Sequence, residues 1–209
     1  MSTNSAGVPR AGGTGPHSAS PIRAQLRQAT AALHEEIEQE LDLTGLSTER
    51  YQPLLETFYG FHLPVESRLA DATPRPDFGW PLRAALLERD LFALGATADS
   101  LAQLPRCTEL PALESSEARA GCLYVLEGAC LGGQIIARDL RQRLGIGPET
   151  GGAFFVGEGA GTAARWSEVI RWIEGLERDG GRQEEMVASA CATFGALLRW
   201  SREQRVARG

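Results

Sequence analysis

The stretch that most constrains the fold is 123–136, LYVLEGACLGGQII, which is strongly apolar and has a helical pattern on both sides but contains three glycines. Each glycine in a helix interior costs about 1 kcal/mol relative to alanine. Gly128 and Gly132 are four residues apart, so they share one helix face on which the main chain carries no side chains. Two interpretations fit such a face: a close crossing with another helix, or a flat or bulky ligand lying against it.

Length and charge limit the classes of function. The chain has 209 residues, which suits one domain with a core large enough to contain a ligand pocket. Its 21 basic residues are scattered among 27 acidic ones, for a net charge of -6. We therefore expect no nucleic acid and no anionic membrane among its partners, because both are attracted by a basic field.

Cysteine spacing and the apolar stretch bear on location. The four cysteines form no pair at metal-ligand or redox spacing, so we expect buried free thiols in a reducing compartment, the cytoplasm. Residues 120–137 are apolar enough to raise the question of a membrane span, but Glu127, Gln134 and the glycines interrupt them. We expect a buried core helix there.

Periodicity predicts an all-α fold. Residues 1–19 hold little to bury and are expected to form a disordered N-terminal tail, His17 included, followed by one domain over 20–205. Apolar residues recur at spacings of three and four in six segments, near 21–41, 48–70, 82–94, 116–144, 163–178 and 183–202. Pro64 is expected to kink or divide the second, and 145–161 to form an ordered loop. We predict a bundle of six to eight helices with mostly antiparallel neighbours.

A polar line on the first helix contains the candidate metal ligand. Arg27, Thr30, His34 and Glu38 follow one another at helical spacing beside the apolar stripe. A neutral imidazole at His34 can bind a metal, and Glu38 can accept from its other ring nitrogen. The structural alternative is a surface histidine with an ordinary i, i+4 carboxylate. One histidine cannot hold a bare zinc ion, but it can hold a haem, which needs a single axial side chain.

These segments carry a resemblance. The stretch 26–38, LRQATAALHEEIE, together with 124–134, YVLEGACLGGQ, is similar to the haem oxygenases of the soluble bacterial, biliverdin-producing type. The similarity extends through 59–66, Asp90–Leu91 and 193–200, and so covers nearly everything between Ile22 and Arg202. It implies an all-α, single-domain helical bundle in which haem is clamped between a proximal first helix and a bent, glycine-rich distal helix.

The resemblance also implies roles for individual residues. His34 corresponds to the proximal iron ligand and Glu38 to the acceptor behind it. Arg27 and Tyr124 correspond to residues that bind the haem propionates, although a solvated arginine and a core tyrosine are the structural alternatives. Gly128 and Gly132 correspond to the distal glycines above the iron. Further haem contacts are implied for these positions: Thr30, Gly133 and Phe194.

The activity implied is oxidative cleavage of haem, as both substrate and cofactor, to biliverdin, carbon monoxide and ferrous iron. It uses O2 and electrons from a ferredoxin- or flavodoxin-type donor. Animal-type members have an aspartate directly after the first distal glycine, whereas this chain has Ala129, as the bacterial members also lack that acid. Two alternatives are a haem carrier or sensor that leaves its ligand intact, and a helical scaffold for another small ligand, such as a thiamine-related compound.

Overall fold

Helix α5 (Ser116–Leu144) begins and ends where local chemistry predicts. The Ser115 hydroxyl accepts a hydrogen bond from the Ala118 N–H at 2.9 Å, which satisfies one of the free donors of the first turn. Gly145 ends the helix with φ of 69°, a left-handed conformation that glycine adopts without a steric penalty. The prediction of one long helix through the glycine-bearing stretch is confirmed.

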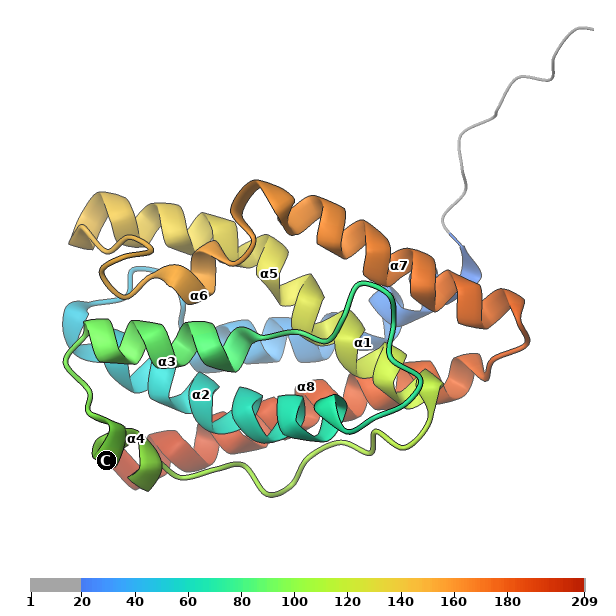
Figure 1. Ribbon diagram of the computed structural model, residues 1–209, viewed down its shortest axis with the longest axis horizontal. Helices are drawn as coiled ribbons and strands as arrows, with labels where there is room; N and C mark the ends of the chain where they lie inside the picture. The colour runs from blue at the N-terminus through green and yellow to red at the C-terminus, as the bar shows by residue number, and fades with distance from the viewer. Residues whose placement is uncertain (1–19, 209) are drawn as a thin grey trace, which may run out of the picture.

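The computed structural model describes residues 20–208, which contain only helices and connections (Figure 1). The predicted tail, 1–19, lies outside the described residues. The all-α prediction is confirmed, and the last helix runs past the expected domain end at 205. Besides α5, the elements are α1 (Pro21–Leu41), α2 (Thr48–Ala70), α3 (Arg83–Ala93), α4 (Ala98–Gln103), α6 (Ala153–Val156), a 3-10 turn η1 (Gly159–Gly161), α7 (Thr162–Arg178) and α8 (Gln183–Arg208).

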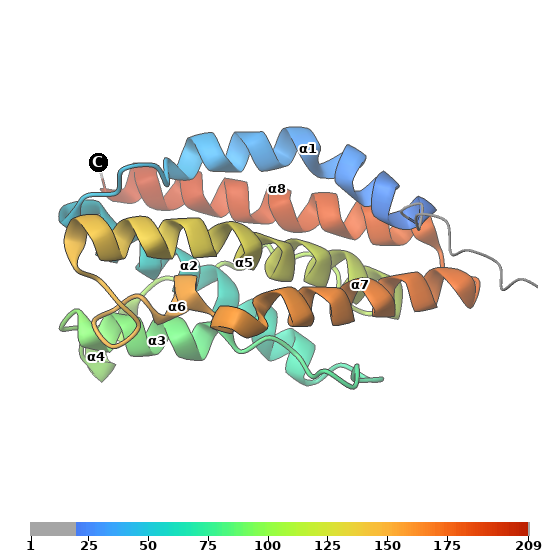
Figure 2. The same cartoon turned by 90° about the horizontal axis from the view of Figure 1, so that it is seen from above.

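The core of the bundle is built around α8, on which both α1 and α5 pack. Figures 1 and 2 show that α1, α5 and α8 all run in the same direction. The expectation of antiparallel neighbours therefore holds for the packed pairs α2 with α3 and α5 with α7, and is wrong for this central set. The reason is connectivity: Figure 1 shows that the segment 104–115 returns the chain across the molecule before α5 begins, and that α7 does so before α8.

Helix α2 continues through Pro64, so of the two expected effects, a kink or a division, the division is wrong. Proline lacks an N–H and therefore leaves the carbonyl four residues earlier without its helical partner. That carbonyl belongs to Gly60, and it accepts from the Cys107 N–H at 2.9 Å. A connecting segment 47 residues further along the chain thus replaces the missing hydrogen bond.

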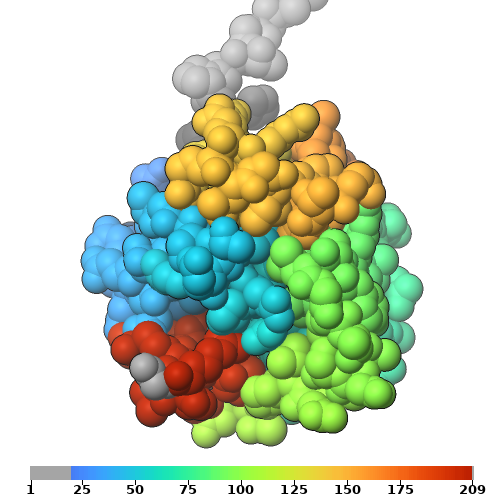
Figure 3. Space-filling model, turned by 90° about the vertical axis from the view of Figure 1, so that its left-hand side faces the viewer, coloured from blue at the N-terminus to red at the C-terminus, as the bar shows by residue number. Residues whose placement is uncertain are grey.

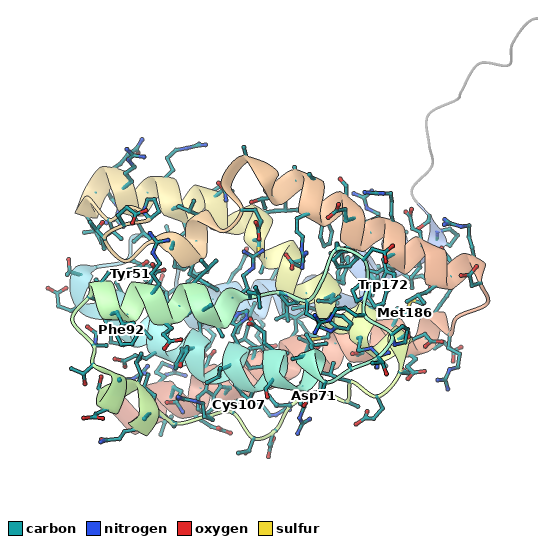
Figure 4. The ribbon with its side chains drawn as sticks, in the orientation of Figure 1. Tyr51, Asp71, Phe92, Cys107, Trp172 and Met186 are labelled. Carbon is teal, nitrogen blue, oxygen red and sulfur yellow. The ribbon has the colours of Figure 1, made fainter. Side chains whose placement is uncertain are left out.

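The segment 145–161 is more regular than the predicted loop, because it contains α6 and η1. The Asp90 carboxylate accepts from the N–H groups of Ala153 and Phe154, each at 2.7 Å, and so satisfies the first donors of α6. The Tyr51 hydroxyl donates to the Gly151 carbonyl at 2.7 Å, and Figure 4 shows Tyr51 beside this segment. These partners are 63 to 100 residues away in the chain.

One end of the molecule is formed by elements from several parts of the chain. Figure 3 looks onto this end, where the α1–α2 connection, α3 with α4, and the last turns of α5 and α8 form one continuous surface. The Arg143 side chain of α5 donates to the Leu46 carbonyl at 2.9 Å and so links α5 to the α1–α2 connection. This contact fixes the end of α5 that follows the glycines.

Helix α5 is the one helix within 20–208 that is long and apolar enough to cross a membrane. It packs against α6, α7 and α8, and it contains the buried charged side chains of Arg119 and Glu127. Both observations fit the core helix expected from the sequence.

The cysteines are free, as predicted, but only Cys107 and Cys122 are buried, while Cys130 and Cys191 are partly exposed. Burial raises the pKa of the Cys122 thiol to about 12, from an ordinary value of 9. The folded state therefore holds this proton at pH values where the unfolded chain releases it. Its contribution to stability is complete below pH 9 and is lost as the pH rises toward 12.

We expect the free energy of unfolding to fall between pH 9 and 12, with up to about 1.4 kcal/mol per pH unit from this one group. Urea unfolding at pH 8 and pH 10 measures the loss. The Cys122→Ala variant, which has no thiol to ionise, should lose less stability over the same interval. Equal losses in the two proteins would contradict this account.

Candidate functional site

The glycines of α5 divide into two kinds. Gly121 lies at the crossing of α5 with α8, where an added Cβ would be 2.1 Å from the Met186 carbonyl oxygen and 2.8 Å from the Ala190 nitrogen. The Ser189 hydroxyl, also on α8, donates to the Ala118 carbonyl at 2.5 Å. At this position the close helix crossing is the correct interpretation.

At Gly128 and Gly132, the main chain of α5 carries no side chain and is partly exposed. A Cβ on Gly128 would be in ordinary contact with the Trp166 ring at 3.4 Å, and a Cβ on Gly132 would meet nothing within 4 Å. Leu131 and Ile135 beside them are 41% and 69% exposed. Gly128, Leu131, Gly132 and Ile135 form what we call the open face of α5. Exposed apolar side chains around bare main chain are the surface that a flat apolar ligand needs.

Gly133, for which the resemblance implies a haem contact, does not lie on this face. It is buried, and an added Cβ would be 3.1 Å from the Phe155 carbonyl oxygen of α6. Successive residues of a helix differ by about 100°, so Gly132 and Gly133 point to different surroundings. Gly133 allows α6 to pack closely on α5.

His34 lies on the exposed edge of α1, with 53% of its side chain accessible. Its Nδ1 is 3.5 Å from a carboxylate oxygen of Glu38, which is the expected pairing. Phe194 of α8 packs edge-on against the imidazole, with ring centres 5.8 Å apart. Nδ1 faces the carboxylate, so the hydrogen bonds among residues 20–208 leave Nε2 free to bind a metal.

Tyr124 connects α5 with α1. Its side chain lies beside Thr30 of α1, whose hydroxyl donates to the Leu26 carbonyl at 2.8 Å. Burial raises the pKa of the Tyr124 phenol, while the nearby positive charges of Arg23 and Arg27 oppose that rise. Sequence reasoning named Arg27 but missed Arg23, although Arg23 stands one helical turn before it.

His34 and Glu38 on α1 lie at the same levels along the bundle as Gly128 and Gly132 on α5. Because α1 and α5 run in the same direction (Figure 2), one turn beyond the Thr30–Tyr124 contact leads to His34 on α1 and to Gly128 on α5. One turn further lie Glu38 and Gly132. The arrangement presents an oriented imidazole on one helix, bare main chain on the other, and cationic side chains at the Tyr124 end.

A buried ion-pair network behind the open face was not foreseen. The Glu127 carboxylate accepts from Arg83 Nη2 at 2.9 Å and from Arg165 Nε and Nη2 at 3.1 and 3.0 Å. Only 1% of the Glu127 side chain is exposed. Glu127 thus points away from the glycine face, toward α3 and α7. The only signal for this network in the sequence was an acid inside an apolar helix.

A separate cavity of about 390 Å³ lies between the end of α2, the segment 75–82 and α7. Trp80, Leu82 and Arg165 are among its lining residues, and His34 and the open face of α5 are not. Arg165 donates to the carbonyls of Phe78 and Gly79 there. Arg165 is thus already engaged with the protein.

Comparison with known proteins agrees with this geometry. The family described as "Heme oxygenase" matches residues 20–203. A curated "Heme oxygenase" from Xanthomonas campestris pv. campestris (strain 8004) is 35% identical over 101 residues, which are 47% of this chain and 57% of that protein. The match therefore spans a little over half of the relative's length. No solved structure matches the chain significantly.

Proposed function

The chain belongs to the haem oxygenase family, and from this premise we propose that it cleaves haem to biliverdin, carbon monoxide and ferrous iron. The observation that carries the proposal is the pairing of a half-exposed His34, oriented by Glu38, with bare main chain at the same level of α5. We further propose a cytoplasmic location, as the free cysteines suggest.

The residues fit a haem substrate. One axial imidazole is sufficient, because the porphyrin supplies the other four nitrogens. Leu131 and Ile135 offer apolar surface to the ring, while Gly132 leaves room for it to approach the main chain. Arg23 and Arg27 lie at the Tyr124 end, where two carboxylates of the ligand would find positive charge.

Each group of residues has a physical task. His34 binds the iron through Nε2 while Glu38 holds the ring by Nδ1. The bound haem supplies the reaction with O2, for which it is both cofactor and substrate. The open face provides no side-chain acid beside the iron, because Glu127 is held by two arginines and the position after Gly128 is Ala129. Neutral surroundings favour attack on the ring over the proton-assisted cleavage that acids promote in peroxidases.

Electrons come from outside the chain in this proposal. We propose a ferredoxin- or flavodoxin-type donor, which is the donor that the resemblance of the sequence implies. O2 is the second substrate. The donor is tested by mixing the haem complex with reduced ferredoxin or flavodoxin and following haem loss.

The deciding experiment is aerobic reduction of the purified haem complex. Irreversible loss of the Soret band, with carbon monoxide release and bilin recovered by chromatography, supports the enzyme. A spectrally stable complex under the same conditions would instead identify a carrier or sensor. Failure to bind haem at one equivalent would remove both and favour another small ligand.

The Gly132→Leu variant tests the open face. We expect it to fold as well as the parent protein, because nothing lies within 4 Å of an added Cβ and leucine favours helix over glycine by about 0.8 kcal/mol. The side chain should nevertheless occupy the haem surface and weaken haem binding at least about tenfold. Absorbance titration measures the affinity.

The matched control is Gly175→Leu, at another helical glycine, in α7, whose added Cβ would meet only the end of Arg178 at 3.8 Å. It should bind haem like the parent protein. Normal haem binding by Gly132→Leu would show that the ligand does not use this face.

A further inference from the structure

The buried carboxylate of Glu127 immediately precedes Gly128 in α5 and receives hydrogen bonds from two helices. Arg83 is the first residue of α3, and Arg165 belongs to the first turn of α7. Arg83 is also 3.7 Å from the Glu158 carboxylate, and Arg165 is held by the carbonyls of Phe78 and Gly79. Both guanidinium groups are therefore anchored independently of α5.

The open face lacks anchors of its own. Gly128 and Gly132 have no side chain, and Leu131 and Ile135 are exposed. Beside this face, Gly133 packs on α6 and the Gln134 side chain donates to the Val156 carbonyl at 2.6 Å, so the face is held through its neighbours in the helix. Glu127 is the last charged side chain before this segment, and its hydrogen bonds hold α5 one residue before Gly128.

Stability alone does not account for such a network. Bringing three charged groups into a buried site costs several kcal/mol per ion, and apolar side chains of similar volume often stabilise as well or better. Arg83 and Glu127 have 3% and 1% of their side chains exposed, so this cost is fully incurred. What the network adds over apolar packing is direction, because each hydrogen bond requires a defined distance and angle.

We propose that Glu127 is a positioning residue that sets the rotation of α5, and thereby the placement of the bare main chain of Gly128 over the haem. The inference rests on the proposed function. Glu127 acts through Arg83 and Arg165 and does not touch the ligand. Loss of its charge lets the open face turn, which changes the surroundings of the iron and the ring edge that faces the main chain.

The test uses the full-length Glu127→Gln variant loaded with haem. Glutamine keeps the shape and one acceptor oxygen but leaves two arginines opposite a neutral amide. We expect the midpoint of the pH-dependent spectral change of the ferric haem complex to shift by about half a pH unit or more. The proportions of bilin isomers should change as well, with haem affinity reduced about tenfold or less.

Arg119→Gln is the matched control. Arg119 is likewise buried, on the same helix, and donates to the carbonyls of Leu113, Glu114 and Thr73. It lies more than two turns before Gly128. This variant should lose thermal stability, while the spectral midpoint and the isomer proportions stay at the parent values.

Glu127→Asp keeps the charge with a side chain shorter by one methylene, and it covers the case in which Glu127→Gln does not fold. If the length of the Glu127 side chain sets the rotation of α5, Glu127→Asp should shift the spectral midpoint. If the charge only stabilises the fold, the midpoint should stay at the parent value. Parent-like midpoint and isomers in a folded Glu127 variant would overturn the inference. If the parent protein itself fails to bind or degrade haem, the proposed function fails instead, and the two failures are distinguished by that first measurement.

Discussion

The His34→Ala variant is expected to fold like the parent protein and to lose haem turnover. The imidazole is half exposed, so its removal costs little folding energy. As the only proposed protein ligand of the iron, it should contribute at least about 100-fold to haem affinity, more than an outer hydrogen-bonding partner does. Absorbance titration, carbon monoxide release and thermal unfolding measure the three properties separately.

Two comparisons make this result specific. Added imidazole should restore part of the haem spectrum of His34→Ala by occupying the vacated position, and Glu38→Gln should weaken haem binding by about 10- to 100-fold at most. Bilin formation by His34→Ala at the parent rate would show that another group binds the iron.

The Gly121→Ala variant is expected to lose the most stability. Its methyl group would be 2.1 Å from the Met186 carbonyl oxygen and 2.8 Å from the Ala190 nitrogen, and both are main-chain atoms that cannot turn aside. The crossing of α5 and α8 must therefore widen, which costs about 3 kcal/mol or more. For a domain of this size the melting temperature should fall by roughly 6–12 °C.

Gly132→Ala is the control for this change. The substitution is identical and on the same helix, but it meets nothing within 4 Å. It should be neutral or stabilise by up to about 1 kcal/mol through helix propensity. A similar fall in melting temperature for both variants would mean that the two glycines do not differ in the way the structure indicates.

The boundaries of α5 show what short-range sequence information can predict. Ser115 and Gly145 act on groups within a few residues of themselves, so the start and end of the helix can be predicted from the sequence. The same holds for the pairing of His34 with Glu38, which follows from helical spacing alone. The continuity of α2 through Pro64 could not be predicted from the sequence, because the replacement donor, the Cys107 N–H, comes from a distant connection.

The glycines and Glu127 show what only the tertiary structure decided. Gly121, Gly132 and Gly133 look alike in the sequence, yet one meets α8, one meets open space and one meets α6. In the sequence, Glu127 is an acid in an apolar run. Its partners Arg83 and Arg165 are 44 and 38 residues away, and only the fold brings them to it. Spacing along a helix determines which residues share a face, whereas the role of that face depends on which element of the fold lies opposite it.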